Sequence, residues 1–133
     1  MYENFKLAKT EYGTIEGYLW HVDDPVKVVC IIHGIGEYAG RYDRIAERLM
    51  KDKIAVVSMD LRGHGLTAGP RGHCAPRDKV LGDVTVLLDF AKTKYPGKDI
   101  ILYGHSMGGN ITFDYRARGE LCDLPAAYLI TSP

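Results

Sequence analysis

The sequence GHSMG, from Gly104 to Gly108, decides how the rest of the chain is interpreted. It is a G-x-S-x-G motif that lies between a short apolar run and a segment of helical periodicity. Such a strand-to-helix turn strains the backbone of its serine and presents the hydroxyl at the carboxyl end of a sheet. Glycines on both sides allow the neighbouring backbone to pass closely. We therefore predict that Ser106 is a catalytic nucleophile, with Gly104, His105 and Gly108 supporting the turn.

Strand and helix patterns alternate along the chain around this motif. Runs of apolar, often β-branched residues predict four strands, at Val26–His33, Ile54–Met59, Ile100–Tyr103 and Ala126–Ile130. Apolar residues at helical spacing predict three helices, within residues 42–50, 80–95 and 106–119. The stretch Arg62–Pro76 contains four glycines and two prolines and is predicted to be a loop.

Two further runs, Phe5–Thr10 and Gly13–Trp20, have no helix between them and predict an antiparallel hairpin at one edge of the sheet. Strands that alternate with helices pair in parallel through right-handed crossovers. We therefore predict an α/β fold in a single domain over residues 1–133, with a mostly parallel sheet of about six strands flanked by helices. The last strand is expected at an open apolar edge, which proteins normally avoid.

The composition is that of an ordinary globular protein: 133 residues, 46% apolar, with 17 basic and 17 acidic side chains. These values exclude a disordered chain and a polybasic nucleic-acid binder. The odd set of three cysteines, Cys30, Cys74 and Cys122, fits a reducing compartment better than a disulfide framework or a zinc site. There is no signal-peptide core and no apolar run of the ~20 residues that a membrane span needs. We expect a cytoplasmic protein with no nucleic-acid partner and no stable membrane insertion.

A second glycine-rich segment, which begins at His33 and Gly34, follows the first buried strand. An HG pair in that position is typical of the loop that donates one of the two oxyanion N–H groups in hydrolases of this architecture. We predict that the backbone N–H groups of Ile35 and Met107 stabilise a developing oxyanion. His33 and Gly34 are expected to support the loop.

The same glycines permit a different interpretation. Gly34, Gly36 and Gly40 follow a strand and open a helix, and Asp60 ends the next strand, as in a dinucleotide-binding fingerprint. However, the spacing is G-x-G-x-x-x-G instead of G-x-G-x-x-G, and Glu37 would place a carboxylate where the pyrophosphate should lie. We therefore keep a dinucleotide-binding domain as the less favoured alternative.

Three motifs together resemble a known family. HGIGEYAGRY (33–42), DLRGHG (60–65) with a trailing GPRG (69–72), and GHSMGG (104–109) are similar to the α/β-hydrolase superfamily and occur in its order. The resemblance is strongest to its monoacylglycerol lipase, lysophospholipase and serine aminopeptidase-like branch. It implies a serine hydrolase that cleaves carboxylic esters, with monoacylglycerols or lysophospholipids as leading small acyl-ester substrates. The reaction would proceed through an acyl-enzyme on Ser106, with neither an organic cofactor nor a metal.

Part of that machinery is missing from the sequence. In this superfamily the acid and then the histidine follow the serine along the chain. None of the five histidines, at positions 21, 33, 64, 73 and 105, follows Ser106. The acids that do follow it, Asp114, Glu120 and Asp123, do not match the family position for the orienting acid. The resemblance therefore implies the N-terminal portion of an α/β-hydrolase core, without the cap, the last two strands and the catalytic base.

Two expectations about partners follow. The chain is expected to be inactive alone, as a truncated or cleaved product or as one chain of a two-chain enzyme. It would then associate with the missing C-terminal half in trans, or with itself through the open sheet edge. The alternative is a non-catalytic binding protein. It would have kept the G-x-S-x-G turn at Ser106, here called the elbow, and lost the histidine and acid that complete a catalytic triad.

Three charged residues near the predicted site are expected to have structural roles. Asp60 and Arg62 flank a strand end, where they would pair with each other or cap a loop. Glu37 is expected to cap or brace the helix that follows the oxyanion loop.

Overall fold

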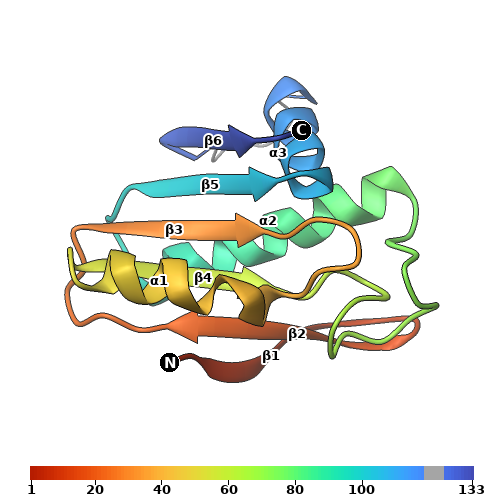
Figure 1. Ribbon diagram of the computed structural model, residues 1–133, viewed down its shortest axis with the longest axis horizontal. Coiled ribbons are helices and arrows are strands. Elements are labelled where there is room, and N and C mark those ends of the chain that lie inside the picture. The colour runs from red at the N-terminus through yellow and green to blue at the C-terminus, as the bar shows by residue number, and fades with distance from the viewer. Residues whose placement is uncertain (119–124) are drawn as a thin grey trace.

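The computed structural model describes residues 1–118 and 125–133, which contain one six-stranded sheet (Figure 1). The strands lie in the order β1-β2-β4-β3-β5-β6. Their bounds are β1 Glu3–Thr10, β2 Gly13–Trp20, β3 Lys27–Ile32, β4 Ile54–Met59, β5 Ile100–His105 and β6 Ala127–Thr131. All six predicted strands are therefore confirmed, with ends that shift by one or two residues.

The pairing confirms the predicted mixed α/β sheet. β1 and β2 form the antiparallel hairpin, and β2 joins β4 in antiparallel orientation. β4, β3, β5 and β6 are parallel, so β6 lies at the outer edge opposite the hairpin, as expected. β5 extends two residues beyond the predicted Tyr103, because its ladder with β6 continues to the pair His105–Thr131. This extension brings the strand directly to the G-x-S-x-G turn.

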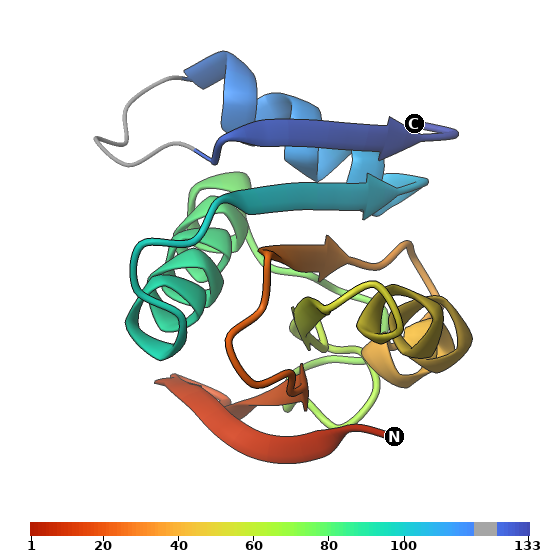
Figure 2. The same ribbon diagram turned by 90° about the vertical axis from the view of Figure 1, so that its left-hand side faces the viewer.

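The helices form one layer on each face of the sheet. A 3-10 turn, η1 (Ala39–Tyr42), leads into α1 (Asp43–Met50) on one face. The other face is covered by α2 (Arg77–Lys94) and α3 (Met107–Arg118), as Figure 2 shows. Of the helices in residues 1–118 and 125–133, none combines the length and the apolar character that crossing a bilayer requires.

The central strand β3 shows why its sequence is a nearly unbroken apolar run. Val28, Cys30 and Ile32 face α2 and α3, whereas Val29 and Ile31 face α1. All five side chains are buried. A parallel strand covered on both faces needs apolar residues at successive positions instead of alternate ones. β3 therefore anchors both halves of the core, and its carboxyl end points to the segment that begins with His33.

Core packing predicts a large difference between two adjacent residues of α2. Leu87 is fully buried, whereas Val86 is 37% exposed. Leu87→Ala should lower the free energy of unfolding by roughly 2–5 kcal/mol, because truncation loses burial and leaves a cavity. Val86→Ala is the matched control and should change it by less than about 1 kcal/mol. Urea unfolding followed by circular dichroism measures both, and equal losses would contradict the assigned helix face.

Candidate active site

Ser106 occupies the turn between β5 and α3 with a backbone φ of +57°. This left-handed conformation is uncommon for a residue with a side chain and stores strain. Two hydrogen bonds hold it in place. The N–H of Ser106 donates to the carbonyl of Thr131 at 2.9 Å, and its carbonyl accepts from the N–H of Asn110 at 3.1 Å. The turn is thus fixed by strand β6 on one side and by the first turn of α3 on the other.

Two glycines make this turn possible by their lack of a side chain. A Cβ at Gly104 would lie 2.0 Å from the carbonyl oxygen of Gly108, and a Cβ at Gly108 would lie 2.0 Å from the carbonyl oxygen of Ile32. Real Cβ atoms essentially never approach backbone so closely. The start of α3 therefore rests directly on the backbone at the ends of β3 and β5.

The loop after β3 lies against the elbow. A Cβ on Gly34 would be 3.1 Å from the Cβ of Ser106 and 3.2 Å from the carbonyl oxygen of His105. In residues 1–118 and 125–133, no hydrogen bond engages the N–H of Ile35 or of Met107. Met107 is the first residue of α3, where unpaired N–H groups and the positive end of the helix dipole favour negative charge. The assignment of these two groups as oxyanion donors stays a prediction.

His33 links this loop to the loop after β4. Its Nδ1 donates to the carbonyl oxygen of Gly34 at 2.7 Å, and its Nε2 accepts from the N–H of Leu61 at 2.9 Å. The imidazole is therefore neutral, since Nε2 can accept only without a proton. Burial lowers the pKa of His33, in agreement with this neutral form. The ring lies beneath the oxyanion loop and connects it to the neighbouring loop.

Glu37 supports the loop itself and, through Tyr42 and Arg41 of η1, also braces the helical segment that follows, which is one of the two expected roles. Its Oε2 accepts from the N–H of Gly34 at 2.7 Å and from the hydroxyl of Tyr42 at 3.0 Å, and its Oε1 lies 3.4 Å from Arg41. The caps of η1 and α1 contain no side-chain hydrogen bond. Burial would raise the pKa of Glu37, but the Gly34 N–H, Tyr42 and Arg41 together lower it. The carboxylate is thus charged and closes the loop back on its own first residue.

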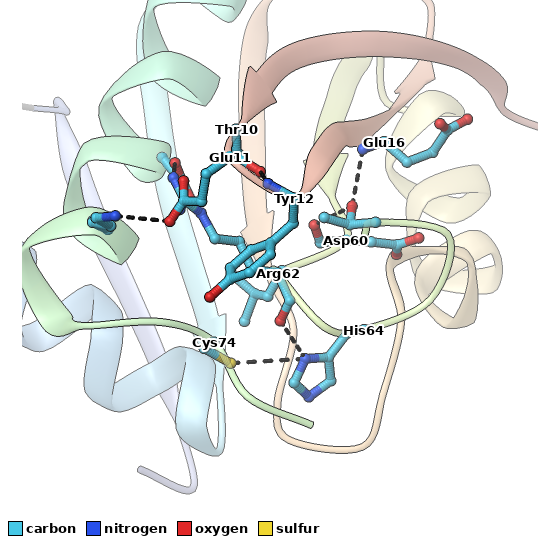
Figure 3. A network of polar contacts seen from close by, with 12 residues as sticks. Thr10, Glu11, Tyr12, Glu16, Asp60, Arg62, His64 and Cys74 are labelled. Atoms are coloured by element: carbon cyan, nitrogen blue, oxygen red, sulfur yellow. Dashed lines mark hydrogen bonds and ion pairs between the residues drawn. The ribbon is translucent and has the colours of Figure 1, made fainter. Parts of the chain in front are cut away.

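Asp60 and Arg62 do not pair with each other, which corrects one of the two roles considered for them. Arg62 binds the carboxylate of Asp83 on α2 through Nε at 2.8 Å and NH2 at 3.0 Å, and it reaches Glu11 at 3.2 Å. Asp60 instead accepts hydrogen bonds from backbone N–H groups, which is the loop-capping alternative. Figure 3 shows the two side chains leaving the end of β4 in different directions.

The buried His64 and the half-buried Cys74 contact each other in the same region (Figure 3). The Sγ of Cys74 lies 3.7 Å from Nδ1 of His64, which also contacts the carbonyl oxygen of Arg62 at 3.1 Å. Burial raises the pKa of the Cys74 thiol, so it is protonated and not an activated nucleophile. Within the described residues, no group of three or more potential metal ligands is found. Cys122 lies outside those residues.

No catalytic base is assembled beside the serine in the described ranges. His105 points its Nδ1 to the hydroxyl of Thr131 at 2.8 Å, and His33 is fully engaged by backbone. Asp114 on α3 pairs with Arg77 and Arg118, so it does not orient a histidine. Glu120 and Asp123 lie outside the described residues. In the described residues, the site thus brings together the predicted nucleophile Ser106 and the unpaired N–H groups of Ile35 and Met107, without an imidazole.

Comparison with known proteins agrees with this geometry. A family model described as serine aminopeptidase, S33, matches residues 23–129. The monoacylglycerol lipase of Mycolicibacterium smegmatis is 40% identical over 101 residues, and phospholipase YtpA of Bacillus subtilis is 37% identical over 98 residues. These alignments cover 75% and 74% of this chain but 36% and 37% of the two relatives. The chain therefore spans little more than a third of their length.

A solved structure is likewise matched by nearly all of this chain over less than half of its own length. The fold is similar to that of a soluble variant of monoglyceride lipase from Saccharomyces cerevisiae, with a TM-score of 0.72 and 26% sequence identity. The match covers 96% of this chain and 42% of the yeast chain.

The elbow glycine Gly108 should tolerate no side chain. Gly108→Ala places a methyl group 2.0 Å from the Ile32 carbonyl oxygen, so either α3 must move or the fold must lose stability. We expect a loss of at least about 3 kcal/mol, at the upper end of point-mutation effects. Gly82→Ala is the control, because nothing lies within 4 Å of its added methyl, and it should gain about 0.5–1 kcal/mol in helix α2. Thermal unfolding distinguishes the two, and a neutral Gly108→Ala would refute the close approach.

The neutral His33 predicts that stability depends on pH. The unfolded chain takes up a proton near pH 6.5, whereas the folded chain resists protonation, because burial lowers the pKa of His33. Below about pH 6.5 the unfolded state therefore binds more protons, and the free energy of unfolding falls by up to about 1.4 kcal/mol per pH unit until the folded pKa is reached. Above about pH 6.5 His33 contributes its full stabilisation to the folded state.

Urea unfolding between pH 8 and pH 5 measures this dependence. His33→Asn should show a shallower slope than the unsubstituted chain. His73→Asn, which changes an exposed histidine, should leave the slope unaltered. Parallel slopes for the His33 variant and the unsubstituted chain would show that His33 is not the group responsible.

Proposed function

The chain belongs to the serine aminopeptidase S33 family of α/β-hydrolases, and we propose that it carries the nucleophile and oxyanion hole of a serine esterase. The observation that carries the proposal is Ser106 with a φ of +57° at the N-terminus of α3, against a loop with a free N–H at Ile35. A serine in this conformation has its hydroxyl beside helix N–H groups, where negative charge is stabilised.

The chemistry of the proposed reaction is acyl transfer in two steps. The Oγ of Ser106 attacks the ester carbonyl carbon, and its proton passes to a general base. The N–H groups of Ile35 and Met107 stabilise the resulting oxyanion. The bond to the alcohol breaks, the base returns the proton to that alcohol, and an acyl-Ser106 ester remains. Water, deprotonated by the same base, then releases the carboxylic acid.

The base belongs to polypeptide beyond these 133 residues in our proposal. None of the histidines in the described ranges hydrogen-bonds to Ser106, and the chain spans little more than a third of the two relatives named above. An imidazole and an orienting carboxylate brought against the carboxyl ends of β5 and β6 would complete the triad. Without them the chain should not turn over substrate efficiently.

The proposed substrates are esters of a single acyl chain, such as monoacylglycerols or lysophospholipids. The related proteins named as monoacylglycerol lipase and phospholipase support this class. Two exposed apolar side chains, Ile35 at 64% and Leu66 at 69%, lie on the two loops that meet at Asp60. Burying such side chains against an acyl chain would contribute favourably to binding.

Chemical rescue by free imidazole tests this function on the chain itself. With p-nitrophenyl butyrate and added imidazole, we expect about one equivalent of nitrophenolate per chain and an acyl group on Ser106 in the mass spectrum. Ser106→Ala should remove both, leaving only the reaction of imidazole in solution. Ser132→Ala, at another serine of positive φ, is the matched control and should acylate normally. If Ser106 stays unmodified at all imidazole concentrations, the non-catalytic alternative replaces the esterase proposal.

A further inference from the structure

We propose that Asp60 is a positioning residue that sets the oxyanion loop against Ser106. The inference rests on the proposed function, because it concerns how the Ile35 N–H is aimed at the reacting carbonyl. Asp60 lies at the end of β4 and does not touch Ser106, so it would act through the loop between residues 34 and 39.

The carboxylate of Asp60 collects hydrogen bonds from three separate segments. Oδ1 accepts from the N–H of Ala39 at 2.7 Å. Oδ2 accepts from the N–H of Leu66 at 2.8 Å and from the hydroxyl of Tyr18 at 2.9 Å. The side chain is fully buried, so these three donors replace water entirely. One carboxylate therefore joins β2, the loop after β3 and the loop after β4 through three hydrogen bonds.

The loop that carries the Ile35 N–H is held at its start by His33, whose Nδ1 donates to the Gly34 carbonyl oxygen, and in its middle by Glu37, which binds Tyr42. Its first residue, Gly34, donates to Glu37 at 2.7 Å within the same loop. The side chain of Ile35 is 64% exposed and thus does not pack the loop tip onto the core. The bond from Ala39 to Asp60 fixes the far end of the loop to the sheet. The direction of the Ile35 N–H therefore depends on the position of this carboxylate.

The space around Asp60 also fixes where the carboxylate can lie. A Cβ on Gly65 would be 2.2 Å from its Oδ2 and 2.4 Å from its carboxyl carbon. The loop after β4 therefore wraps closely around the group and prevents it from turning. Asp60→Asn keeps the shape but replaces one acceptor oxygen by an NH2 donor. That donor faces N–H groups, so at least one of the three hydrogen bonds must be lost.

If Asp60 had only a structural role, substituting it would lower the fraction of folded chains without altering the chemistry of those that fold. The rate ratio between an oxygen ester and its thiono analogue distinguishes the two roles. The sulfur of a thionoester accepts N–H hydrogen bonds poorly, so a well-aimed oxyanion hole favours the oxygen ester. This ratio is independent of how many chains are folded. It compares imidazole-rescued acylation of Ser106 by p-nitrophenyl butyrate and by p-nitrophenyl thionobutyrate, each releasing nitrophenolate.

We expect Asp60→Asn to reduce this ratio roughly 10-fold or more, since small misplacements of catalytic groups have large effects on rate. Asp83→Asn is the matched control. It disrupts another buried carboxylate, which binds Arg62 in the loop after β4 and does not contact the loop between residues 34 and 39. It should lower stability and leave the ratio unchanged.

A second variant removes the same hydrogen bond from the donor side. Ala39→Pro deletes the N–H at the first position of η1, where proline is tolerated, and Tyr38 before it is already extended with φ −154° and ψ 160°. It should also reduce the ratio, even if Asp60→Asn fails to fold. An unchanged ratio in a folded variant of either kind overturns the positioning role. An unsubstituted chain that never acylates overturns the proposed function, and the positioning role with it.

Discussion

The close approach of helix α3 to the ends of two strands is the constraint on which the site depends. The carbonyl oxygen of Ile32 occupies the space where Gly108 would carry a Cβ, and the carbonyl oxygen of Gly108 does the same for Gly104. Because backbone meets backbone there, the helix starts at the sheet surface and the chain must reverse direction within one residue. Ser106 is that residue, and its φ of +57° is the geometric result. The conformation of Ser106 is therefore a consequence of how β3, β5 and α3 pack.

Around this turn, two acidic side chains organise the loops by accepting hydrogen bonds from backbone N–H groups. Glu37 closes the loop after β3 on itself, and Asp60 joins that loop to β2 and to the loop after β4. Ion pairs between side chains occur here as well, between Arg62 and both Asp83 and Glu11 and between Glu37 and Arg41. Loops must satisfy their backbone groups without the regular ladder of a strand or helix. Carboxylates at fixed positions do this here, whereas the N–H groups of Ile35 and Met107 have no hydrogen-bond partner in the described residues.

The sequence predicts those features that depend on local pattern. The run Val26–His33 indicates a strand buried on both faces because each successive residue is apolar, and the glycines around Ser106 indicate the elbow because their spacing is short and specific. It cannot show which groups Asp60 binds, because Tyr18, Ala39 and Leu66 lie on three different segments and only meet in the folded chain. The expected pairing of Asp60 with Arg62 was wrong for this reason. A carboxylate beside a guanidinium in sequence need not face it when the backbone turns between them.

The hydrogen bond from the Ser106 N–H to the Thr131 carbonyl has a consequence for the order of events during synthesis. Thr131 belongs to β6, the strand made after α3 and the last one in this chain. A ribosome that adds about 5–20 residues per second completes Ser106 well before its partner exists. Until β6 joins β5, the strained backbone of the serine lacks one of its two restraints. The turn at Ser106 should therefore acquire its shape late, after most of the core is already assembled.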